Sequence, residues 1–394
     1  MVNRLFHRHY LTTLLVNLLL FITFYLLNAS LPLLAAQKFE VSQGSLGWVV
    51  TAFVLATVCS RPLIGHWLDR YELKRMLLLS ASLFTLFSCL YLIILPIESF
   101  GLLLIIRVLH GFSFGMISSS LSLSVTTLIP KQRQGEGMGY FVLSMNLASV
   151  LGPVIGLTLI AHDVMVWYFM TVALLAICSF LFVIRLPLTS SHIPHTSPFR
   201  LRQSLFLASP VLLLATSFAG IAISSTSAFI SLYADSIHHV AYASYFYGLA
   251  ALGMVAIRPL AGKRFDRKGP ASVLVPSYGL YAVGFLVLGF FPTLYGLLSA
   301  ALIIGIGSAS IFPGLQTVML THAAPAQKGK AISTFFLAYD SGFGIGAFLL
   351  SGIAAKTGYS NMFLICSLVV VSSGLLYGYS RRSSATANNQ DIAS

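Results

Sequence analysis

Residues 61–70 read Arg-Pro-Leu-Ile-Gly-His-Trp-Leu-Asp-Arg, and residues 258–267 read Arg-Pro-Leu-Ala-Gly-Lys-Arg-Phe-Asp-Arg. The second copy begins 197 residues after the first, which is half the length of the 394-residue chain. A period equal to half of a protein indicates a duplicated module. In each copy an arginine stands inside an apolar run and an Asp-Arg pair follows it. This pattern is expected where a membrane-spanning helix meets an aqueous turn.

The composition predicts an integral membrane protein, because 57% of the residues are hydrophobic, 8% are charged and the mean hydropathy is +0.89. A bilayer core about 30 Å thick needs roughly 20 apolar residues per spanning helix. We expect twelve such helices, at 11–34, 46–67, 75–95, 99–121, 137–160, 165–186, 209–232, 243–264, 271–291, 293–318, 330–353 and 361–380. These runs are too long and too continuously apolar for barrel strands of about ten alternating residues. The predicted fold class is therefore an all-α membrane protein with two pseudo-symmetric six-helix bundles.

The positive charges predict the topology. Eighteen of the 23 Lys and Arg residues fall at the amino terminus, in alternate turns, beside the central linker and in the tail. The opposite loops hold Lys38 and Lys356, and Arg61, Arg107 and Arg258 lie within predicted helices. Because short cytoplasmic loops carry the excess of positive charge, we expect a multi-pass protein of the cell (inner) membrane with both termini in the cytoplasm. The net charge of +13 follows from this asymmetry, so we expect no nucleic-acid partner.

The domain prediction has four parts. Residues 1–186 form the first six-helix half, 187–208 a polar cytoplasmic linker, 209–382 the second half and 383–394 a disordered cytoplasmic tail. The four cysteines lie far apart in apolar runs, and the histidine pairs have no cluster of Cys or acidic residues nearby, so we expect no metal site.

The duplicated turn resembles the signature of the major facilitator superfamily, approximately G-x-x-x-D-[RK]-x-G-[RK]-[RK]. The matching residues are Gly65, Asp69 and Arg70 in the first copy and Gly262, Asp266 and Arg267 in the second. Glu72 departs from the pattern, since it stands where the family has glycine. The resemblance implies twelve helices, alternating access and a gating role for these residues. Physically, the glycines allow close helix packing, and the aspartates can bridge basic groups or helix N-termini; the alternative is that the charges merely mark tight turns.

Three arginines inside the predicted helices need partners or water, because a charge costs about 2.5–3.5 kcal/mol there on insertion scales. For Arg61 and Arg258, each followed by a helix-bending proline, we expect a structural or gating role. Arg107 resembles the family's second signature, an intramembrane arginine associated with proton coupling in related carriers. His110 shares the helix face of Arg107, and it either titrates near neutral pH or packs as a neutral side chain.

The fifth predicted helix carries Gly152, Pro153 and Gly156. This stretch resembles the Gly-Pro signature of the antiporter branch, in which a bent, glycine-lined helix forms part of the moving seam. Ala148 and Leu157 replace glycines of the fuller motif, which weakens the support for export relative to import. Close packing and a bend are still predicted.

Asp340 is the one carboxylate deep in a predicted helix. An intramembrane ionisable group is a functional hypothesis, and a carboxylate there can load and release a proton according to which side is wet. The alternative is a structural ion pair with Arg258 or Arg107. We therefore treat Asp340, Arg107 and His110 as the proton-coupling candidates.

The substrate is expected near the bilayer centre between the halves. Candidate lining residues are Asn28, Asn146, Tyr25, Phe229, Phe312, Gln316 and Tyr339. A few polar groups in an apolar cavity suit an amphipathic molecule, whereas most of these residues would equally serve helix packing. No phosphate-binding loop of the G-x-x-x-x-G-K-[ST] kind occurs, which argues against ATP as the energy source.

These observations predict a proton-coupled secondary transporter rather than an enzyme, exporting drugs or a secreted metabolite. We expect it to act as a monomer without a cofactor other than the proton gradient, with a small-molecule substrate, protons and the lipid bilayer as its partners. The alternatives are a proton symporter that imports a small metabolite and, from other classes, a membrane receptor that moves nothing or an intramembrane enzyme. An enzyme would need a clustered catalytic set, which the sequence does not contain.

Overall fold

The computed structural model describes residues 5–39, 43–97, 99–162, 165–186, 204–239 and 242–393. Within these ranges the regular elements are helices. In the first part of the chain they are α1 (Arg8–Lys38), α2 (Gln43–Arg70), α3 (Leu73–Leu90), η1 (Tyr91–Ile93), α4 (Ile94–Ile97), α5 (Phe100–Leu128), η2 (Lys131–Arg133), α6 (Gln134–Ala161) and α7 (Met165–Ile184). In the second part they are α8 (Pro210–Ser236), α9 (Ala243–Lys268), α10 (Ala271–Phe290), α11 (Leu294–Ser308), α12 (Ile311–Thr321), η5 (Pro325–Gln327) and α13 (Lys328–Ala393).

Eleven helical stretches among the described residues are long and apolar enough to cross a membrane. The last one, Pro325–Arg382, covers 58 residues. Gly358 interrupts its helix with a φ of 82°, a conformation that suits glycine because it has no Cβ. Because one span needs only about 20 residues, this stretch holds two spans. The prediction of an all-α membrane fold with twelve spans is confirmed.

Two regions differ from the expected helices. The run expected at 293–318 is divided into α11 and α12 at Ala309–Ser310, because Pro313 lacks an N–H and its ring would clash with the carbonyl of Ala309 in a continuous helix. The tail expected to be disordered at 383–394 instead continues the backbone of α13 to Ala393. Extending an existing helix avoids the cost of nucleating one. Most of the predicted linker, 187–203, lies outside the described residues.

The chain forms two compact units. Unit 1 comprises Met1–Pro130, Tyr140–Leu205 and Pro325–Ser333, and unit 2 comprises Lys131–Gly139, Phe206–Ala324 and Thr334–Ser394. Each unit therefore contains a short segment from the other part of the sequence. The first turns of α6 belong to unit 2, and the first turns of α13 belong to unit 1.

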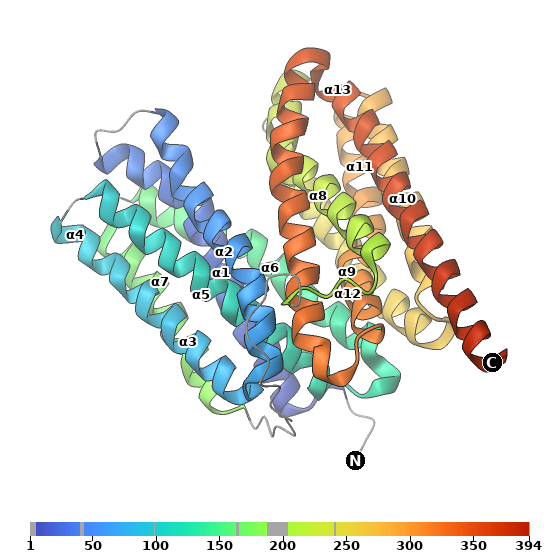
Figure 1. Cartoon of the computed structure of the whole chain (residues 1–394). Coiled ribbons are helices and arrows are strands. Elements are labelled where there is room, and N and C mark those ends of the chain that lie inside the picture. The colour runs from blue at the N-terminus through green and yellow to red at the C-terminus, as the bar shows by residue number, and fades with distance from the viewer. Residues whose placement is uncertain are drawn as a thin grey trace. The chain divides into compact units, whose positions relative to one another are not determined.

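In unit 1, α5 packs against α2 and α3, while α7 packs against α1 and α3 (Figure 1). Small residues allow this close packing. A Cβ added to Gly111 of α5 would lie 2.3 Å from the carbonyl oxygen of Phe53 in α2, and one added to Gly115 would lie 2.6 Å from Ser60 Oγ. The glycine seam predicted in this helix thus faces α2.

In unit 2, α11 packs against α9 and α10. A Cβ on Gly305 would lie 2.1 Å from the carbonyl oxygen of Ala250, and one on Gly307 would lie 2.4 Å from the backbone nitrogen of Tyr281. The glycines of α11 therefore allow both α9 and α10 to pack closely against it.

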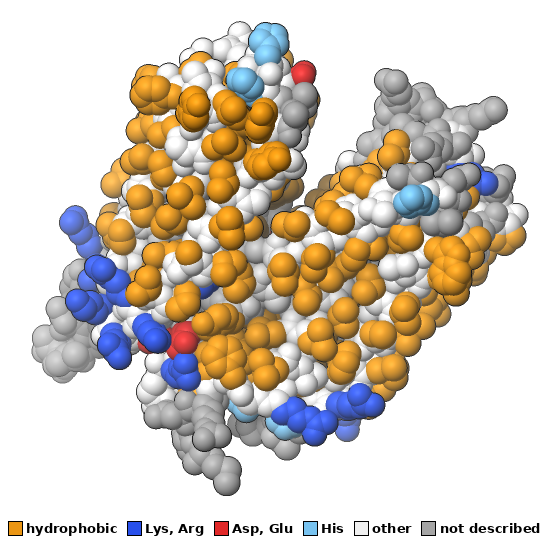
Figure 2. Space-filling view, turned by 180° about the vertical axis from the view of Figure 1, so that it is seen from behind, with side chains coloured by type: hydrophobic (Ala, Val, Ile, Leu, Met, Phe, Trp, Pro, Cys, Tyr) orange, Lys and Arg blue, Asp and Glu red, His pale blue; other side chains and the backbone are white. Residues whose placement is uncertain are grey.

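The surface is suited to a bilayer. Figure 2 shows hydrophobic side chains over the flanks of each unit, whereas most of the visible Lys and Arg side chains gather at one end of each unit. Apolar flanks with charges confined to the helix ends are expected of helices surrounded by lipid.

Candidate functional site

The first copy of the duplicated block holds the start of a distant helix. Asp69, at the end of α2, accepts hydrogen bonds from the backbone N–H of Gly329 at 2.8 Å and of Lys330 at 3.3 Å, both in the first turn of α13. The Lys330 ammonium lies 4.0 Å from the same carboxylate. A Cβ on Gly65 would lie 3.2 Å from Lys330 Cα and 3.1 Å from Ser333 Cβ, so glycine permits this approach. A carboxylate complements both the unpaired amides and the dipole of a helix N-terminus.

The second copy repeats this arrangement in unit 2. Asp266, near the end of α9, accepts hydrogen bonds from the N–H of Gly135 at 2.7 Å and of Glu136 at 3.1 Å, in the first turn of α6. A Cβ on Gly262 would lie 2.7 Å from Glu136 Cα. Arg133 holds Glu136 in place through contacts of 2.8 and 2.7 Å. Both copies therefore place their glycine and aspartate against the start of one helix.

The arginines that follow the two aspartates do not share this geometry. Arg70 is partly exposed and lies over the Tyr71 ring at 5.8 Å, and Arg267 is exposed. The contacts that hold the helix starts come from the aspartates.

Inside the helices, the two duplicated arginines have different surroundings. Arg61 of α2 donates from Nη1 to the carbonyl oxygen of Gly115 and to the hydroxyls of Ser118 and Ser119, at 3.1, 3.1 and 2.7 Å. Arg258 of α9 is equally buried, yet its Nε and Nη2 have no hydrogen-bond partner among the described residues. The serine partners of Arg61 were not predicted, although consecutive serines in an apolar helix were a visible signal.

Arg107 of α5 is fully buried in unit 1. Its Nε donates to the carbonyl oxygen of Val49 at 2.6 Å, its Nη2 donates to Asn28 Oδ1 at 2.5 Å, and the guanidinium lies 4.4 Å from the centre of the Phe53 ring. Asn28, expected to line a substrate cavity, is therefore a partner of the buried arginine.

His110 lies one turn further along α5 and is also fully buried. Its Nε2 is 3.2 Å from Ser88 Oγ, and its Nδ1 is 3.3 Å from the hydroxyl of Tyr91. The ring of Phe84 lies 4.6 Å away. Because a hydroxyl can donate or accept, both ring nitrogens of a neutral imidazole are satisfied. The geometry favours the packed alternative for His110.

Helix α6 packs closely on α1. A Cβ on Gly152 would lie 2.7 Å from Tyr25 Cβ and 2.9 Å from the carbonyl oxygen of Ile22, and one on Gly156 would lie 2.4 Å from Ser30 Oγ. Pro153 stands inside the same helix. Tyr25 therefore faces this packing seam, and its ring lies 4.9 Å from that of Phe24.

Asp340 lies on α13 in unit 2 and is half-buried. The same stretch of α13 packs tightly on α8, because a Cβ on Gly342 would lie 2.1 Å from the carbonyl oxygen of Ser217. The preceding residue, Tyr339, contacts Phe312 of α12 edge to face at 4.7 Å. Asp340 thus directly follows a residue of an aromatic pair on a closely packed helix.

The predicted cavity residues divide between the units. Tyr25, Asn28 and Asn146 belong to unit 1, and Phe229, Phe312, Gln316 and Tyr339 belong to unit 2. Within unit 2 the structure brings Phe312 and Tyr339 together, whereas Phe229 contacts Tyr359 at 6.4 Å. Gln316 is fully buried and Asn146 is half-buried. In the described part of the chain, no three His, Cys, Asp or Glu side chains are grouped so as to hold a metal ion.

Comparison with known proteins identifies close similarities in sequence and fold. A family model described as Major Facilitator Superfamily matches residues 13–275 and 265–393. The chain is 26% identical over 353 residues to multidrug resistance protein MdtG of Enterobacter lignolyticus, covering 86% of this chain and 84% of that protein. It is 22% identical over 377 residues to the staphylopine export protein of Staphylococcus aureus, covering 90% and 92%. The crystal structure of the human organic anion transporter MFSD10 (TETRAN) superposes with a TM-score of 0.79 at 18% identity, covering 94% of this chain and 98% of that one.

Proposed function

The chain belongs to the major facilitator superfamily, and on this premise we propose that it is a proton-coupled secondary transporter that exports amphipathic small molecules by alternating access. It is a multi-pass membrane protein, and its family and relatives are transporters, so the expectation that it is not an enzyme is confirmed. Export is supported by the names of the relatives, a multidrug resistance protein and a staphylopine export protein. We further propose an inner-membrane location with both termini in the cytoplasm, and a monomer that needs no cofactor.

One observation carries the alternating-access proposal: both copies of the duplicated block hold a helix start through an aspartate. Asp69 binds the first turn of α13, and Asp266 binds the first turn of α6. Hydrogen bonds between a carboxylate and helix amides form at one distance and are lost when the helix start moves away. These contacts therefore favour one conformation and break in the other. Further inside the membrane, Arg61 joins α2 to α5 through hydrogen bonds to Gly115 and Ser119.

Proton coupling is assigned to Asp340, with Arg107 as the second candidate. Asp340 is half-buried on α13, which packs on α8 through Gly342. A carboxylate in this position exchanges a proton with whichever side of the membrane is wet, and its charge then biases the conformational equilibrium. Arg107 is already held by Asn28 and Val49, so in this conformation it acts as a fixed positive charge.

The substrate class follows from the same region. Phe312 and Tyr339 form an edge-to-face pair in unit 2, and Tyr339 directly precedes Asp340 on α13. Aromatic surfaces with few polar groups favour amphipathic ligands over sugars, whose recognition needs many hydrogen bonds.

Transport into proteoliposomes tests the proposal. Purified protein is reconstituted, a pH gradient is imposed, and the movement of fluorescent amphipathic cations and neutral compounds is followed. Export coupled to proton entry predicts substrate movement opposite to the proton flux; movement that ignores the gradient would contradict proton coupling, and movement in the direction of the proton flux would favour the symport alternative.

The matched variants are Asp340→Asn and Asp235→Asn. Asp340→Asn is expected to abolish gradient-driven transport while the protein remains folded and still equilibrates substrate. Asp235 is exposed at the end of α8, so Asp235→Asn is expected to leave the transport rate unchanged. Full coupling in Asp340→Asn would return this residue to a structural role.

A further inference from the structure

Arg258 is a buried cation for which the described residues provide no ion pair. The residue is 4% exposed, and its Nε and Nη2 have no hydrogen-bond partner in the described part of the chain. Its counterpart in the first copy, Arg61, donates to a carbonyl and two serine hydroxyls. A buried charge without compensation is strongly unfavourable, so the difference between the two copies requires an explanation.

The sequence explains why the second copy lacks these partners. The positions that lie 197 residues after Ser118 and Ser119 are Leu315 and Gln316. Leucine offers no acceptor, and the side-chain oxygen of Gln316 makes no hydrogen bond with a described residue. The second copy therefore has the arginine but not the hydroxyls that serve it in the first copy.

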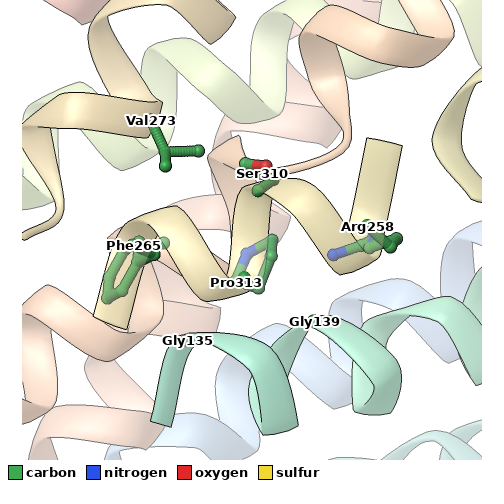
Figure 3. A pocket seen from close by; sticks show the side chains of 10 residues that line it. Gly135, Gly139, Arg258, Phe265, Val273, Ser310 and Pro313 are labelled. Carbon is green, nitrogen blue, oxygen red and sulfur yellow. The ribbon is translucent and has the colours of Figure 1, made fainter. Parts of the chain in front are cut away.

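The guanidinium instead faces a small cavity within unit 2 (Figure 3). In the figure the side chain of Arg258 extends from α9 toward Pro313 of α12, above Gly139 of α6. The lining residues are Gly135, Gly139, Arg258, Ala261, Gly262, Phe265, Val273, Ser310, Pro313 and Gly314. None of these residues is a carboxylate.

The start of α12 adds one hydrogen-bond donor to the cavity wall, the hydroxyl of Ser310. Ser310 is the N-cap residue of α12 and makes no side-chain capping bond. The backbone amides at this wall are not free donors, because Pro313 has no N–H and the N–H of Gly314 donates to the carbonyl oxygen of Ser310. The cavity is thus lined by a guanidinium and a hydroxyl.

The nearby acidic side chains are engaged elsewhere. Asp266 accepts from the amides of Gly135 and Glu136, and Glu136 itself pairs with Arg133. The unsatisfied donors therefore face a space that contains no protein acceptor with a negative charge.

We propose that this cavity is a binding site for a single small monovalent anion, chloride, held by Arg258 and the hydroxyl of Ser310. The enclosed space is about that of one water-sized particle. This size favours a monatomic halide over a larger anion such as phosphate. A water molecule has to donate hydrogen bonds as well as accept them, whereas an anion only accepts them. An anion therefore suits a cavity in which donor groups surround a buried cation.

The anion also stabilises the packing around it. Gly135 and Gly139 bring the first turns of α6 over the cavity, and a Cβ on Gly139 would lie 3.6 Å from Nη1 of Arg258. Because these turns form one wall, chloride binds most tightly while they stay packed on α9. Binding to the folded, closed cavity raises the stability of that arrangement.

Thermal unfolding of the purified protein tests the proposal. Chloride is titrated against gluconate at constant ionic strength, because gluconate is too large for the cavity, and bromide serves as a second halide. Wild-type protein is expected to show a saturable rise in Tm of about 2–4 °C at tenfold to hundredfold excess over Kd. No rise in the wild type would overturn the proposal.

Arg258→Gln is expected to lose the halide-dependent rise, and Arg61→Gln, the matched change in the first copy, is expected to keep it. An equal rise in Arg258→Gln would overturn the assignment to this cavity. If Arg258→Gln does not fold, two further measurements decide. Ser310→Ala should weaken halide binding several-fold, and anomalous diffraction from crystals grown in bromide should show a peak beside Arg258; an unchanged halide affinity in Ser310→Ala together with an empty cavity at saturating bromide would refute the site.

Discussion

The carboxylate of Asp69 accepts a hydrogen bond from the backbone amide of Gly329 at 2.8 Å, although 260 positions separate the two residues in the chain. The same relationship recurs between Asp266 and Gly135 at 2.7 Å. In each case a carboxylate at the end of one helix caps the start of another. The repeat is therefore preserved in its long-range contacts as well as in its sequence.

Removing one of these carboxylates should shift the conformational equilibrium. In Asp69→Ala the first turn of α13 loses a charged acceptor worth roughly 1.5–3 kcal/mol, so the population with this contact broken should rise about tenfold or more. Ser333 is 1% exposed beside Gly65 and becomes accessible when the contact opens. The measurement is the labelling rate of Ser333→Cys by a maleimide, in a protein whose four native cysteines are replaced.

Glu72→Ala provides the control for this experiment. Glu72 forms a surface ion pair with Arg75, whose side chain is 84% exposed, and such pairs contribute little. Its labelling rate should match the wild type. An equal labelling rate in Asp69→Ala would show that the carboxylate only terminates α2.

Gly152→Ala should destabilise the packing of α6 on α1. The added Cβ would lie 2.8 Å from the backbone nitrogen of Leu26 and 2.9 Å from the carbonyl oxygen of Ile22, and backbone atoms cannot move aside as a flexible side chain can. We expect a loss of about 1–3 kcal/mol, typical of overpacking, seen as a lower Tm in detergent.

Gly352→Ala is the matched control, because a Cβ at this exposed position of α13 meets nothing within 4 Å. Alanine is better than glycine in a helix by about 0.5–1 kcal/mol, so the Tm should stay equal or rise slightly. A Tm for Gly152→Ala as high as that of Gly352→Ala would mean that α6 does not approach α1 so closely.

The sequence was sufficient to predict the spans, because each helix that crosses a bilayer needs about 20 mostly apolar residues. Such runs are visible in the sequence itself. It did not reveal the break between α11 and α12, because the run from Leu294 to Thr321 is apolar enough on average to be one span. Pro313 was the available signal, but proline also occurs inside α2, α6, α9 and α10, where the helix continues. A proline in the sequence therefore predicts a bend, but it does not predict whether the helix continues or breaks there.

The sequence predicted which residues need partners better than it predicted the partners themselves. Arg61 and Arg107 lie in apolar runs, so the sequence predicted that they need hydrogen-bond acceptors. These acceptors come from residues 54 to 79 positions away in the chain. Neutral acceptors such as Asn28 and Ser119 carry no charge pattern that would pair them with an arginine. Only the packing of α1, α2 and α5 brings them together.

Asn28 should matter to stability through Arg107. Asn28→Ala leaves the buried Nη2 of Arg107 without its acceptor, which should cost about 1.5–3 kcal/mol. Asn361→Ala removes an exposed amide that donates to Thr357 and should cost little. The Tm of each variant measures the effect.

A double-mutant cycle then separates this pair from general packing. In the background of Arg107→Gln, the additional loss from Asn28→Ala should be smaller, because the charge that needs the acceptor is gone. Equal losses in both backgrounds would show that Asn28 acts independently of Arg107.

His110→Gln distinguishes a packed histidine from a proton carrier. The imidazole lies between Ser88 and Tyr91 with both nitrogens within 3.3 Å of a hydroxyl, and Phe84 covers its face. Glutamine keeps a donor and an acceptor but does not titrate, so gradient-driven transport should remain within about twofold of wild type while stability falls by roughly 1–3 kcal/mol from the lost packing and hydrogen bonds. Transport in proteoliposomes at several pH values measures the first effect, and thermal unfolding the second. Loss of proton coupling in a stable His110→Gln protein, with Asp340→Asn still coupled, would move the titrating group from unit 2 to the core of unit 1.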